Sequence, residues 1–336
     1  MPGSEQLSDT FNAIVARDRD GKVQGRLEAL AADDLPDEDV LVEISHSTLN
    51  YKDGLAVSGR GKICRRLPMV CGIDLAGIVR ESRDGRFQAG DRVLVNGYEL
   101  SEKYWGGYAQ RQRLKGDWLV PVPEAFTAEQ TMALGTAGYT AMLSVLAIQD
   151  AGLTPDAGPA LVTGATGGVG AVSVMLLAAL GYQVTGVTGK PDGAQFLQSL
   201  GATGTIARDE LARDSRPLES ETWAAAVDSV GGSTLATALA QTRRGGLVAA
   251  VGLAGGFRLP TTVMPFILRG VTLRGIDSVM ASQERRRRAW DALAELVDTA
   301  KLAEIYRVAP MSEVPALANL ILDGGISGRV VIDVNA

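Results

Sequence analysis

Hydrophobic positions are grouped most densely over residues 159–190, a stretch that carries no charged side chain before its last residue. Residues 160–163 are a short apolar run and predict a buried strand. Residues 164–170 form a glycine-rich turn, and residues 171–180 are helix formers followed directly by a glycine. Another apolar run predicts a second strand over 183–188. We interpret this order as a βαβ unit of the kind that binds a dinucleotide.

Two glycines stand where a dinucleotide-binding turn needs them. Gly167 and Gly170 match the second and third glycines of the G-x-G-x-x-G pattern, and Ala165 replaces the first. The backbone must approach the pyrophosphate there, and the N–H groups of the turn and of the helix start hold its charge. A glycine turn without a ligand is the plainer alternative. A membrane span is another, but the longest unbroken apolar run, 174–180, is far shorter than the ~20 residues that spanning requires.

The wider pattern predicts two regions of different character. Alternating apolar and polar positions before residue 125 indicate a β-rich region. Thr127 and Gln130 then suit the start of a helix that runs through Leu146, and strands alternate with helices from there on. That alternation predicts an α/β fold with a doubly wound parallel sheet, and we expect the last strand to return to the first region. The predicted strands cover 11–15, 41–47, 76–79, 92–95, 105–109, 118–122, 224–227, 247–251, 271–276 and 328–334, and the later helices cover 193–200, 234–241 and 283–302.

Composition narrows the possible partners and compartments. The 336 residues suit two domains, and the hydrophobic fraction of 46% is ample for their cores. A net charge of −6 gives no electrostatic case for nucleic acid or an anionic membrane. Two cysteines cannot form a disulfide framework, and the first eleven residues contain no apolar signal region, so we expect a reducing cytosol. One histidine, His46, and two cysteines are too few ligands for a zinc site, and His46 reads as a strand residue with a satisfied hydrogen bond.

Five motifs occur in a characteristic order along the chain. They are Asn50-Tyr51-Lys52-Asp53, Gly72-Ile73-Asp74-Leu75-Ala76-Gly77, Gly90-Asp91-Arg92-Val93, Gly106-Gly107-Tyr108-Ala109 and the turn 164–170. Together they resemble the medium-chain dehydrogenase/reductase superfamily over nearly the whole chain. The resemblance implies a β-rich GroES-like catalytic domain over 1–125, completed by 303–336, and an NADP-binding Rossmann domain over 126–302. Zinc alcohol dehydrogenases carry Gly-His-Glu at the second motif, so the departure here points to the zinc-free quinone and enoyl reductase branch.

A closer resemblance rests on four segments: 50–53, 208–210, 252–256 and 259–269. They look like the acrylyl-CoA reductase (NADPH) family, which reduces acryloyl-CoA to propanoyl-CoA and includes proteins named quinone oxidoreductases. The resemblance implies a cytoplasmic enzyme, often a homodimer, that acts on an acyl-CoA without a metal. It also implies NADP contacts at Tyr51, Thr166, Gly167, Gly168, Val169, Thr188, Gly189, Lys190, Arg208, Leu253, Ile267 and Ser278.

The residues themselves favour NADPH over NADH. An NAD-binding unit usually ends its second strand with an acidic residue that takes the ribose 2′-hydroxyl. Here the strand ends Val187-Thr188-Gly189-Lys190, so no carboxylate repels a 2′-phosphate and a hydroxyl, an N–H group and a cation are available. Lys190 could equally be a solvated loop residue. Arg208 is a second candidate cation, and sequence alone leaves it open whether it is only a surface residue.

Tyr51 is the candidate for chemistry. Reduction of an α,β-unsaturated thioester delivers a hydride to the β-carbon and a proton to the α-carbon, while negative charge develops on the thioester oxygen. Without zinc a hydrogen-bond donor must stabilise that charge, and a tyrosine with an ordinary pKa of about 10 is protonated at neutral pH. The alternative is that Tyr51 only contacts the cofactor and water supplies the proton. Asn50 and Asp53 either help to position it or only cap the turn.

Three other functions share features of this sequence. A short-chain dehydrogenase would need Tyr-x-x-x-Lys after the glycine turn, and neither Tyr182 nor Tyr306 has lysine four positions on. An NADPH-dependent quinone reductase would share the fold and differ in the acceptor. A non-enzymatic NADPH-binding protein would share the fold and lack turnover, so turnover with any acceptor excludes it.

Charged and reactive residues elsewhere have plain interpretations. The basic stretch 62–66 could meet CoA phosphates, although a solvated charge run is the preferred reading. The arginines over 285–288 suit an exposed helix face paired with neighbours such as Glu284. Cys71 suits a buried small residue rather than a nucleophile. The strand over 271–276 could pair with its copy in a dimer, since an edge strand offers unpaired backbone groups.

Overall fold

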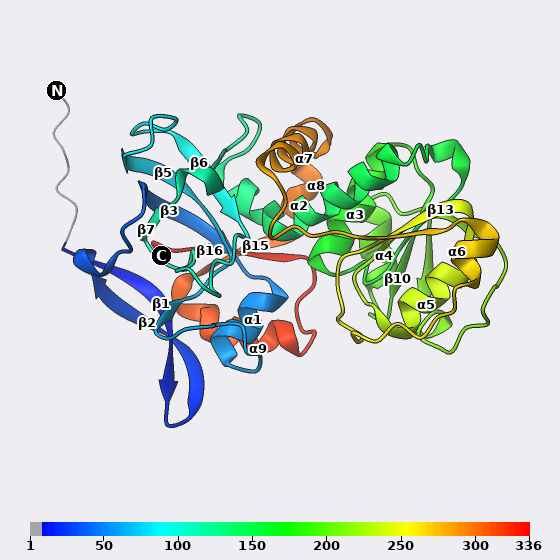
Figure 1. The fold of residues 1–336 in the computed structure, drawn as a ribbon, viewed down its shortest axis with the longest axis horizontal. Coiled ribbons are helices and arrows are strands. Elements are labelled where there is room, and N and C mark those ends of the chain that lie inside the picture. Colours follow the sequence, from blue (N-terminus) through cyan, green and yellow to red (C-terminus); the bar gives the residue numbers. More distant parts are fainter. Residues whose placement is uncertain (1–8) are drawn as a thin grey trace. The chain divides into compact units, whose positions relative to one another are not determined.

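The computed structural model describes residues 9–336 (Figure 1). Most of the N-terminal segment that argued against a signal sequence, residues 1–8, therefore lies outside the described residues. The chain divides into two compact units: one holds the residues up to Thr136 together with Tyr306–Ala336, and the other holds Ala137–Ile305. Each unit has its own sheet and its own hydrophobic core.

The first unit is built on a seven-stranded, largely antiparallel sheet, and it also contains a separate three-stranded sheet. The large sheet has the order β15-β16-β3-β5-β6-β8, and β7 also pairs with β3. The C-terminal strand does return to this unit, because β16 pairs antiparallel with β3 and sets Val331 opposite Thr48. The strands are β3 (Val40–Thr48), β5 (Asp74–Ser82), β6 (Arg92–Asn96), β7 (Arg111–Leu114), β8 (Val120–Pro121), β15 (Tyr306–Pro310) and β16 (Arg329–Asp333), with β1 (Thr10–Arg19), β2 (Lys22–Ala31) and β4 (Met69–Val70) in the small sheet.

Two helices of this unit pack against each other closely. They are α1 (Tyr51–Ser58) and α9 (Val314–Leu322). A β-carbon on Gly54 would lie 2.8 Å from the Ile321 side chain and 2.9 Å from the carbonyl oxygen of Ala318, so only glycine permits this approach. The close packing holds one face of α1 against α9, and Tyr51 at the start of α1 is its exposed end, with 47% of its surface accessible.

The second unit is a six-stranded parallel sheet with the order β11-β10-β9-β12-β13-β14. All five pairings are parallel, as the alternation of strands and helices predicted. Its strands are β9 (Ala160–Val162), β10 (Val184–Thr188), β11 (Gly204–Ala207), β12 (Trp223–Asp228), β13 (Thr242–Ala250) and β14 (Thr272–Gly275), and its helices are α3 (Gly168–Ala179), α4 (Gly193–Ser199), α5 (Gly232–Gln241), α6 (Met264–Arg269), α7 (Gln283–Leu296) and α8 (Thr299–Glu304). Across both units, short 3-10 turns occur at Ala32–Asp34, Gly116–Trp118, Pro155–Ala157, Arg208–Glu210 and Met311–Glu313.

Helix α2 (Ala128–Asp150) begins in the first unit and continues in the second. Thr127 caps its start, because the N–H of Gln130 donates to Thr127 Oγ1 over 3.1 Å and the N–H of Thr127 donates back to the Gln130 side chain. Gly135 interrupts the helix with φ 50° and ψ −154°. The helix is long and apolar enough to cross a membrane by composition, but 94% of its apolar window is buried inside the protein, which suits a core helix equally well.

Among the differences from the predicted secondary structure, three have a clear physical reason. Residues 22–31 are a strand that the pattern did not predict, because much of β2 carries polar, exposed side chains. The strand expected to open at residues 105–109 starts only at Arg111, as β7. A β-carbon on Gly106 would lie 2.1 Å from the carbonyl oxygen of Gly72, so residues 105–109 form a loop that packs on the loop before β5. The helix expected over 283–302 is divided at Val297, and the Asp298 side chain caps the start of α8.

Candidate functional site

The register of β10 and β11 brings two predicted cofactor residues together. Thr188 pairs with Ala207 at the ends of these parallel strands, so Gly189 and Arg208 follow at the same edge of the sheet. A β-carbon on Gly189 would lie 2.9 Å from the guanidinium carbon of Arg208. The guanidinium group therefore rests on the bare backbone of Gly189, which is the reason that a glycine suits this position.

Lys190 completes a cationic corner beside them. Its N–H donates to Thr188 Oγ1 over 3.1 Å, which holds the turn against the end of β10. Partial burial, and then the positive charge of Arg208, lower the pKa of Lys190. Two cations close enough to perturb one another favour an anion between them, and a phosphate monoester is the ligand that suits an arginine and a lysine together.

The glycine turn has the geometry that a dinucleotide requires. Gly164 adopts φ 57° after β9, and α3 begins at Gly168, so the first-turn N–H groups of α3 have no partner within the helix. A β-carbon on Gly170 would lie 2.3 Å from the carbonyl oxygen of Gly164. Gly170 thus allows α3 to pack on the turn, which is the role of the third glycine in the pattern. Thr166 is buried, while Gly167, Gly168 and Val169 are partly exposed.

A buried carboxyl group supports this turn from below. Asp228, at the end of β12, accepts hydrogen bonds from Thr163 Oγ1 at 2.6 Å and from the N–H of Gly231 at 2.8 Å. Burial raises the pKa of Asp228. The carboxyl group ties the ends of β9 and β12 together, and the backbone of Leu253 packs on the same loop beside Gly231. Leu253 is 62% exposed there, available to a ligand.

The remaining predicted contacts lie in the half of the sheet that contains β13 and β14. Ile267 lies on α6 and is exposed, and Ser278 follows β14. The loop that carries Ser278 is held by Arg286, whose guanidinium donates to the carbonyl oxygens of Ser278, Val279 and Ala281 at 3.2, 2.6 and 3.0 Å. Arg286 is only 1% exposed and also lies over the Tyr139 ring. The interpretation of 285–288 as an exposed face was therefore wrong for Arg286.

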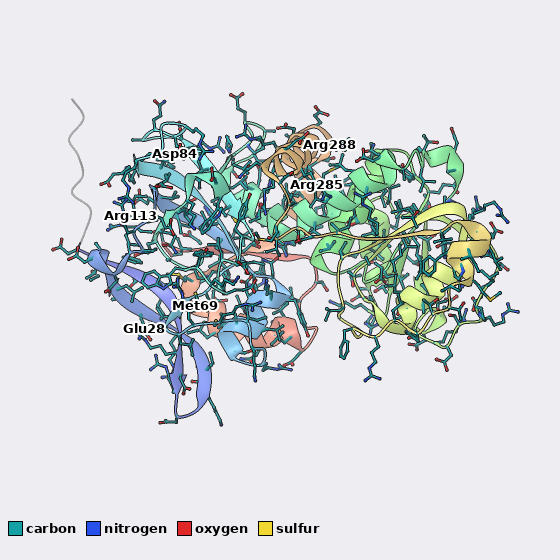
Figure 2. The ribbon with its side chains drawn as sticks, viewed as in Figure 1. Glu28, Met69, Asp84, Arg113, Arg285 and Arg288 are labelled. Atoms are coloured by element: carbon teal, nitrogen blue, oxygen red, sulfur yellow. The ribbon has the colours of Figure 1, made fainter. Side chains whose placement is uncertain are left out.

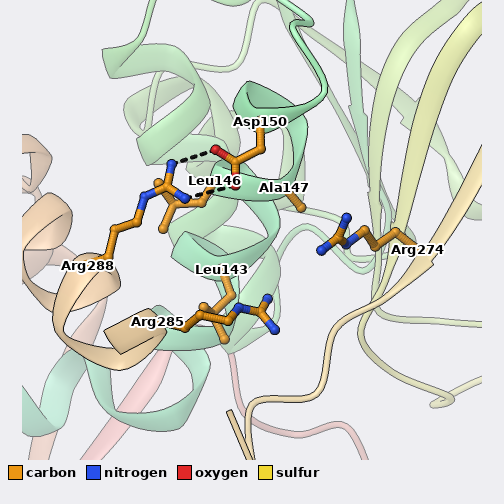
Figure 3. A pocket seen from close by; sticks show the side chains of 7 residues that line it. All are labelled: Leu143, Leu146, Ala147, Asp150, Arg274, Arg285 and Arg288. Atoms are coloured by element: carbon orange, nitrogen blue, oxygen red, sulfur yellow. Dashed lines mark hydrogen bonds and ion pairs between the residues drawn. The ribbon is translucent and has the colours of Figure 1, made fainter. Parts of the chain in front are cut away.

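The other arginines of α7 are exposed, as Figure 2 indicates for Arg285 and Arg288. Arg288 pairs with Asp150 through two hydrogen bonds of 2.6 and 2.9 Å rather than with Glu284, and these bonds lower the pKa of Asp150. Figure 3 shows this pair beside Arg285 and Arg274 around a cavity of about 40 Å³. That volume holds a few waters and excludes a dinucleotide.

In the first unit, Tyr51 lies between two buried polar residues. Asn50 is 9% exposed and Asp53 is fully buried. Asp53 accepts hydrogen bonds from the Asn50 N–H at 2.9 Å, from Asn50 Nδ2 at 3.1 Å and from the Ile73 N–H at 2.9 Å. Burial, and then the charge of Asp74, raise the pKa of Asp53 to about 7.

Asn50 is the centre of a larger buried network. Its Nδ2 also donates to Asp74 at 2.7 Å, and its Oδ1 accepts from Arg329 at 3.2 Å. Arg329 donates further to Thr48 Oγ1 and to the backbone of Ala133, and burial lowers its pKa. Asp74 also accepts from Asn96 at 2.7 Å and from Thr136 at 2.5 and 3.0 Å. One amide thus links a buried cation to two buried carboxyl groups.

Sequence reasoning did not find the outer members of this network. Asp74 belongs to a quoted motif, but no role was derived for it, and Asn96, Thr136 and Arg329 carried no local signal. Arg329 is 279 positions from Asn50 in the chain. Only the pairing of β16 with β3 brings them together.

The residues for which no site role was preferred have structural or exposed positions. His46 lies in β3 with Nδ1 3.1 Å from Ser45 Oγ, and burial lowers its pKa. Cys71 is fully buried, and its hydrogen bond with Cys64, and then burial, raise the pKa of its thiol. Arg65 is largely exposed and lies 3.7 Å from Glu102. Among residues 9–336, no three His, Cys, Asp or Glu side chains are grouped as a metal site would require.

Comparison with known proteins places this geometry in a family. Residues 36–124 match the alcohol dehydrogenase GroES-like domain family, and residues 168–296 match the zinc-binding dehydrogenase family. Acrylyl-CoA reductase AcuI of Ruegeria pomeroyi is 52% identical over 330 residues, which cover 97% of this chain and 100% of that protein. The chain belongs to the medium-chain dehydrogenase/reductase superfamily. The predicted resemblance to this superfamily, and to acrylyl-CoA reductases within it, is thereby confirmed.

Two solved structures of this superfamily are closely similar. Escherichia coli YhdH with bound NADPH has a TM-score of 0.94 and 49% identity, and the match covers 96% of this chain and 100% of that one. Bacillus subtilis yhfP with bound NAD has a TM-score of 0.94 and 40% identity, covering 97% and 100%. The predicted fold class, a GroES-like domain with a Rossmann-like parallel sheet, is therefore confirmed.

Proposed function

We propose that this chain is an NADPH-dependent reductase that converts acryloyl-CoA to propanoyl-CoA. The observation that carries the proposal is the 52% identity over the full length of an acrylyl-CoA reductase, together with the cationic corner of Gly189, Lys190 and Arg208. The NADPH bound to the E. coli relative supports the choice of cofactor. The substrate class is an acyl-CoA thioester.

The cofactor residues are proposed on the geometry of the second unit. Arg208 and Lys190 hold the 2′-phosphate, with Thr188 and Gly189 shaping the turn. The N–H groups of Thr166, Gly168 and Val169 hold the pyrophosphate, and Gly167, whose N–H donates to the carbonyl oxygen of Gly164, lets it approach the backbone. The further contacts are Leu253, Ile267, Ser278 and Tyr51. When bound, NADPH supplies the hydride that the β-carbon of the substrate receives.

The chemical role falls to Tyr51. Its exposed phenol donates a hydrogen bond to the thioester oxygen as negative charge develops there, which favours hydride delivery to the β-carbon; the α-carbon of the resulting enolate then takes its proton from solvent water. The residues up to about 125, completed by 303–336, act as the catalytic domain, and residues 126–302 act as the cofactor domain. We place the enzyme in the cytoplasm as a homodimer. Strand β14 lies at the edge of its sheet and could pair with its copy, which supports the dimer.

The test is NADPH oxidation followed at 340 nm with acryloyl-CoA, crotonoyl-CoA and a 1,4-quinone in parallel. We expect strong preference for acryloyl-CoA. Turnover with the quinone alone would replace the proposal with a quinone reductase, an alternative that the 40% identity to the Bacillus subtilis quinone oxidoreductase YhfP supports. Tight NADPH binding without any turnover would favour a binding protein instead.

A further inference from the structure

Tyr51 and the polar residues around it differ sharply in solvent exposure. Tyr51 is 47% exposed, while its neighbours Asn50 and Asp53 are nine-tenths or more buried. An ordinary helix cap needs no burial, since capping side chains on a protein surface do the same work in water. Burying two polar side chains beside one exposed phenol costs desolvation and therefore indicates a purpose beyond starting a helix.

Asp53 connects the first turn of α1 to a second segment of the chain. One carboxyl oxygen accepts from both nitrogens of Asn50, and the other accepts from the N–H of Ile73 in the loop before β5. The opposite face of α1 is held by the contact of Gly54 with α9. The helix turn that carries Tyr51 is thus held on two sides, so the phenol can move mainly by rotation of its own side chain.

We propose that Asp53 is a positioning residue for Tyr51, which aims the phenol by fastening the first turn of α1 to the Gly72-Ile73-Asp74 loop. This inference rests on the proposed function of Tyr51 as the hydrogen-bond donor. It assigns Asp53 no contact with substrate or cofactor. Asn50 links Asp53 to the rest of the buried network, because its Nδ2 donates to both Asp53 and Asp74 and its Oδ1 accepts from Arg329.

The fastening depends on the charge of Asp53. Its carboxylate accepts three N–H groups when ionised, and a proton on either oxygen weakens at least one of these bonds. Within the described part of the chain, four ionisable groups face the Asp53 carboxylate. They are Asp74 on β5, Cys71 before β5, Tyr108 in the loop before β7, and Arg329 on β16. Burial and Asp74 raise the pKa of Asp53 to about 7, so the fastening weakens as pH falls through neutrality.

A double-mutant cycle separates positioning from simple stability. The variants are Asp53→Asn, Tyr51→Phe and the pair, with Asp37→Asn, an exposed partner of Arg83, as the matched control. We expect Asp53→Asn to lower kcat about tenfold or more in the wild-type background and less than about twofold beside Tyr51→Phe. An equal loss in both backgrounds would overturn the inference, and so would a Tyr51→Phe enzyme as fast as wild type.

Two measurements keep the test independent of how the Asp53 variant folds and of the acceptor. The kcat of the wild type should fall as pH is lowered through about 7, and Tyr51→Phe should lack that limb; a limb shared by both enzymes counts against positioning. Hydrogen exchange of the amides over 51–58, measured without cofactor or substrate, should be faster in Asp53→Asn than in Asp37→Asn. Unchanged hydrogen exchange overturns the inference even if acryloyl-CoA proves not to be the substrate. If the enzyme turns over only the quinone, the same double-mutant cycle is measured with the quinone as acceptor.

Discussion

The guanidinium group of Arg208 lies against the backbone of Gly189, so closely that a β-carbon on residue 189 would stand 2.9 Å from its central carbon. This contact follows from the parallel register of β10 and β11, which sets Thr188 beside Ala207. Arg208 is exposed, and this contact positions its guanidinium group at the end of β10.

Arg208→Ala should reduce the preference for NADPH over NADH. The arginine would lose a charge-assisted hydrogen bond to the 2′-phosphate, worth about 1.5–3 kcal/mol, so kcat/KM for NADPH should fall roughly 10- to 100-fold while that for NADH changes little. Arg216→Ala is the control, because Arg216 is an exposed cation of the same unit. Steady-state kinetics with both cofactors checks this, and an equal loss with NADPH and NADH would remove Arg208 from the phosphate site.

Gly170→Ala should damage both stability and NADPH binding. The new β-carbon would lie 2.3 Å from the carbonyl oxygen of Gly164 and 2.6 Å from the Cα of Ala165, and backbone cannot move aside as a side chain can. We expect a loss of about 1–3 kcal/mol in the free energy of unfolding, measured with urea. Gly85→Ala, where no atom lies within 4 Å of the added carbon, should cost far less. Similar losses in the two variants would contradict the tight turn.

Arg286→Met should destabilise the second unit far more than Arg287→Ala. Arg286 is buried and its guanidinium satisfies carbonyl oxygens of Ser278, Val279 and Ala281, which the thioether of methionine cannot do. Leaving them without a donor should cost about 3 kcal/mol, whereas the exposed Arg287 should cost less than about 0.5 kcal/mol. Equal unfolding midpoints for the two variants would show that the loop before α7 does not depend on this arginine.

The pH dependence of stability should report on Asp53. Burial raises the pKa of Asp53 from 3.8 to about 7, so between these pH values the folded chain keeps a proton that the unfolded chain has released. The contribution of this group to the free energy of unfolding is present at low pH and is lost as pH rises through about 7. Asp53→Asn should therefore show a flatter decline than wild type between pH 4 and 7. Parallel curves for the two proteins would mean that Asp53 stays ionised in the folded state.

The parts of the fold that were predicted correctly are those written in local patterns. The βαβ unit of residues 159–190 follows from apolar runs and glycines within a short stretch, and Gly170, matched to the third glycine of the pattern, packs closely on the turn. The break before α8 had a local signal as well, since Asp298-Thr299 is a helix-start pattern inside the expected long helix. It was overlooked because the amphipathic pattern continues across it.

The catalytic half could not be assembled from sequence because its contacts are long-range. Tyr51, Asn50 and Asp53 are adjacent in the chain and were found together, but Asp74 and Arg329 reach Asn50 only through pairings of β3 with β5 and β16. A run of like charges in the sequence also does not indicate which of its side chains is buried. Among the arginines of 285–288 only the structure separates buried Arg286 from its exposed neighbours.

The central claim is that this chain reduces the C=C bond of acryloyl-CoA with NADPH. Its most direct test is to run the reaction with NADPH deuterated at C4 on the transferred face, and separately in D₂O, and to locate the label in the product by NMR. The account predicts propanoyl-CoA with cofactor deuterium on the β-carbon and solvent deuterium on the α-carbon. Cofactor deuterium on the α-carbon, or no propanoyl-CoA at all, would contradict it.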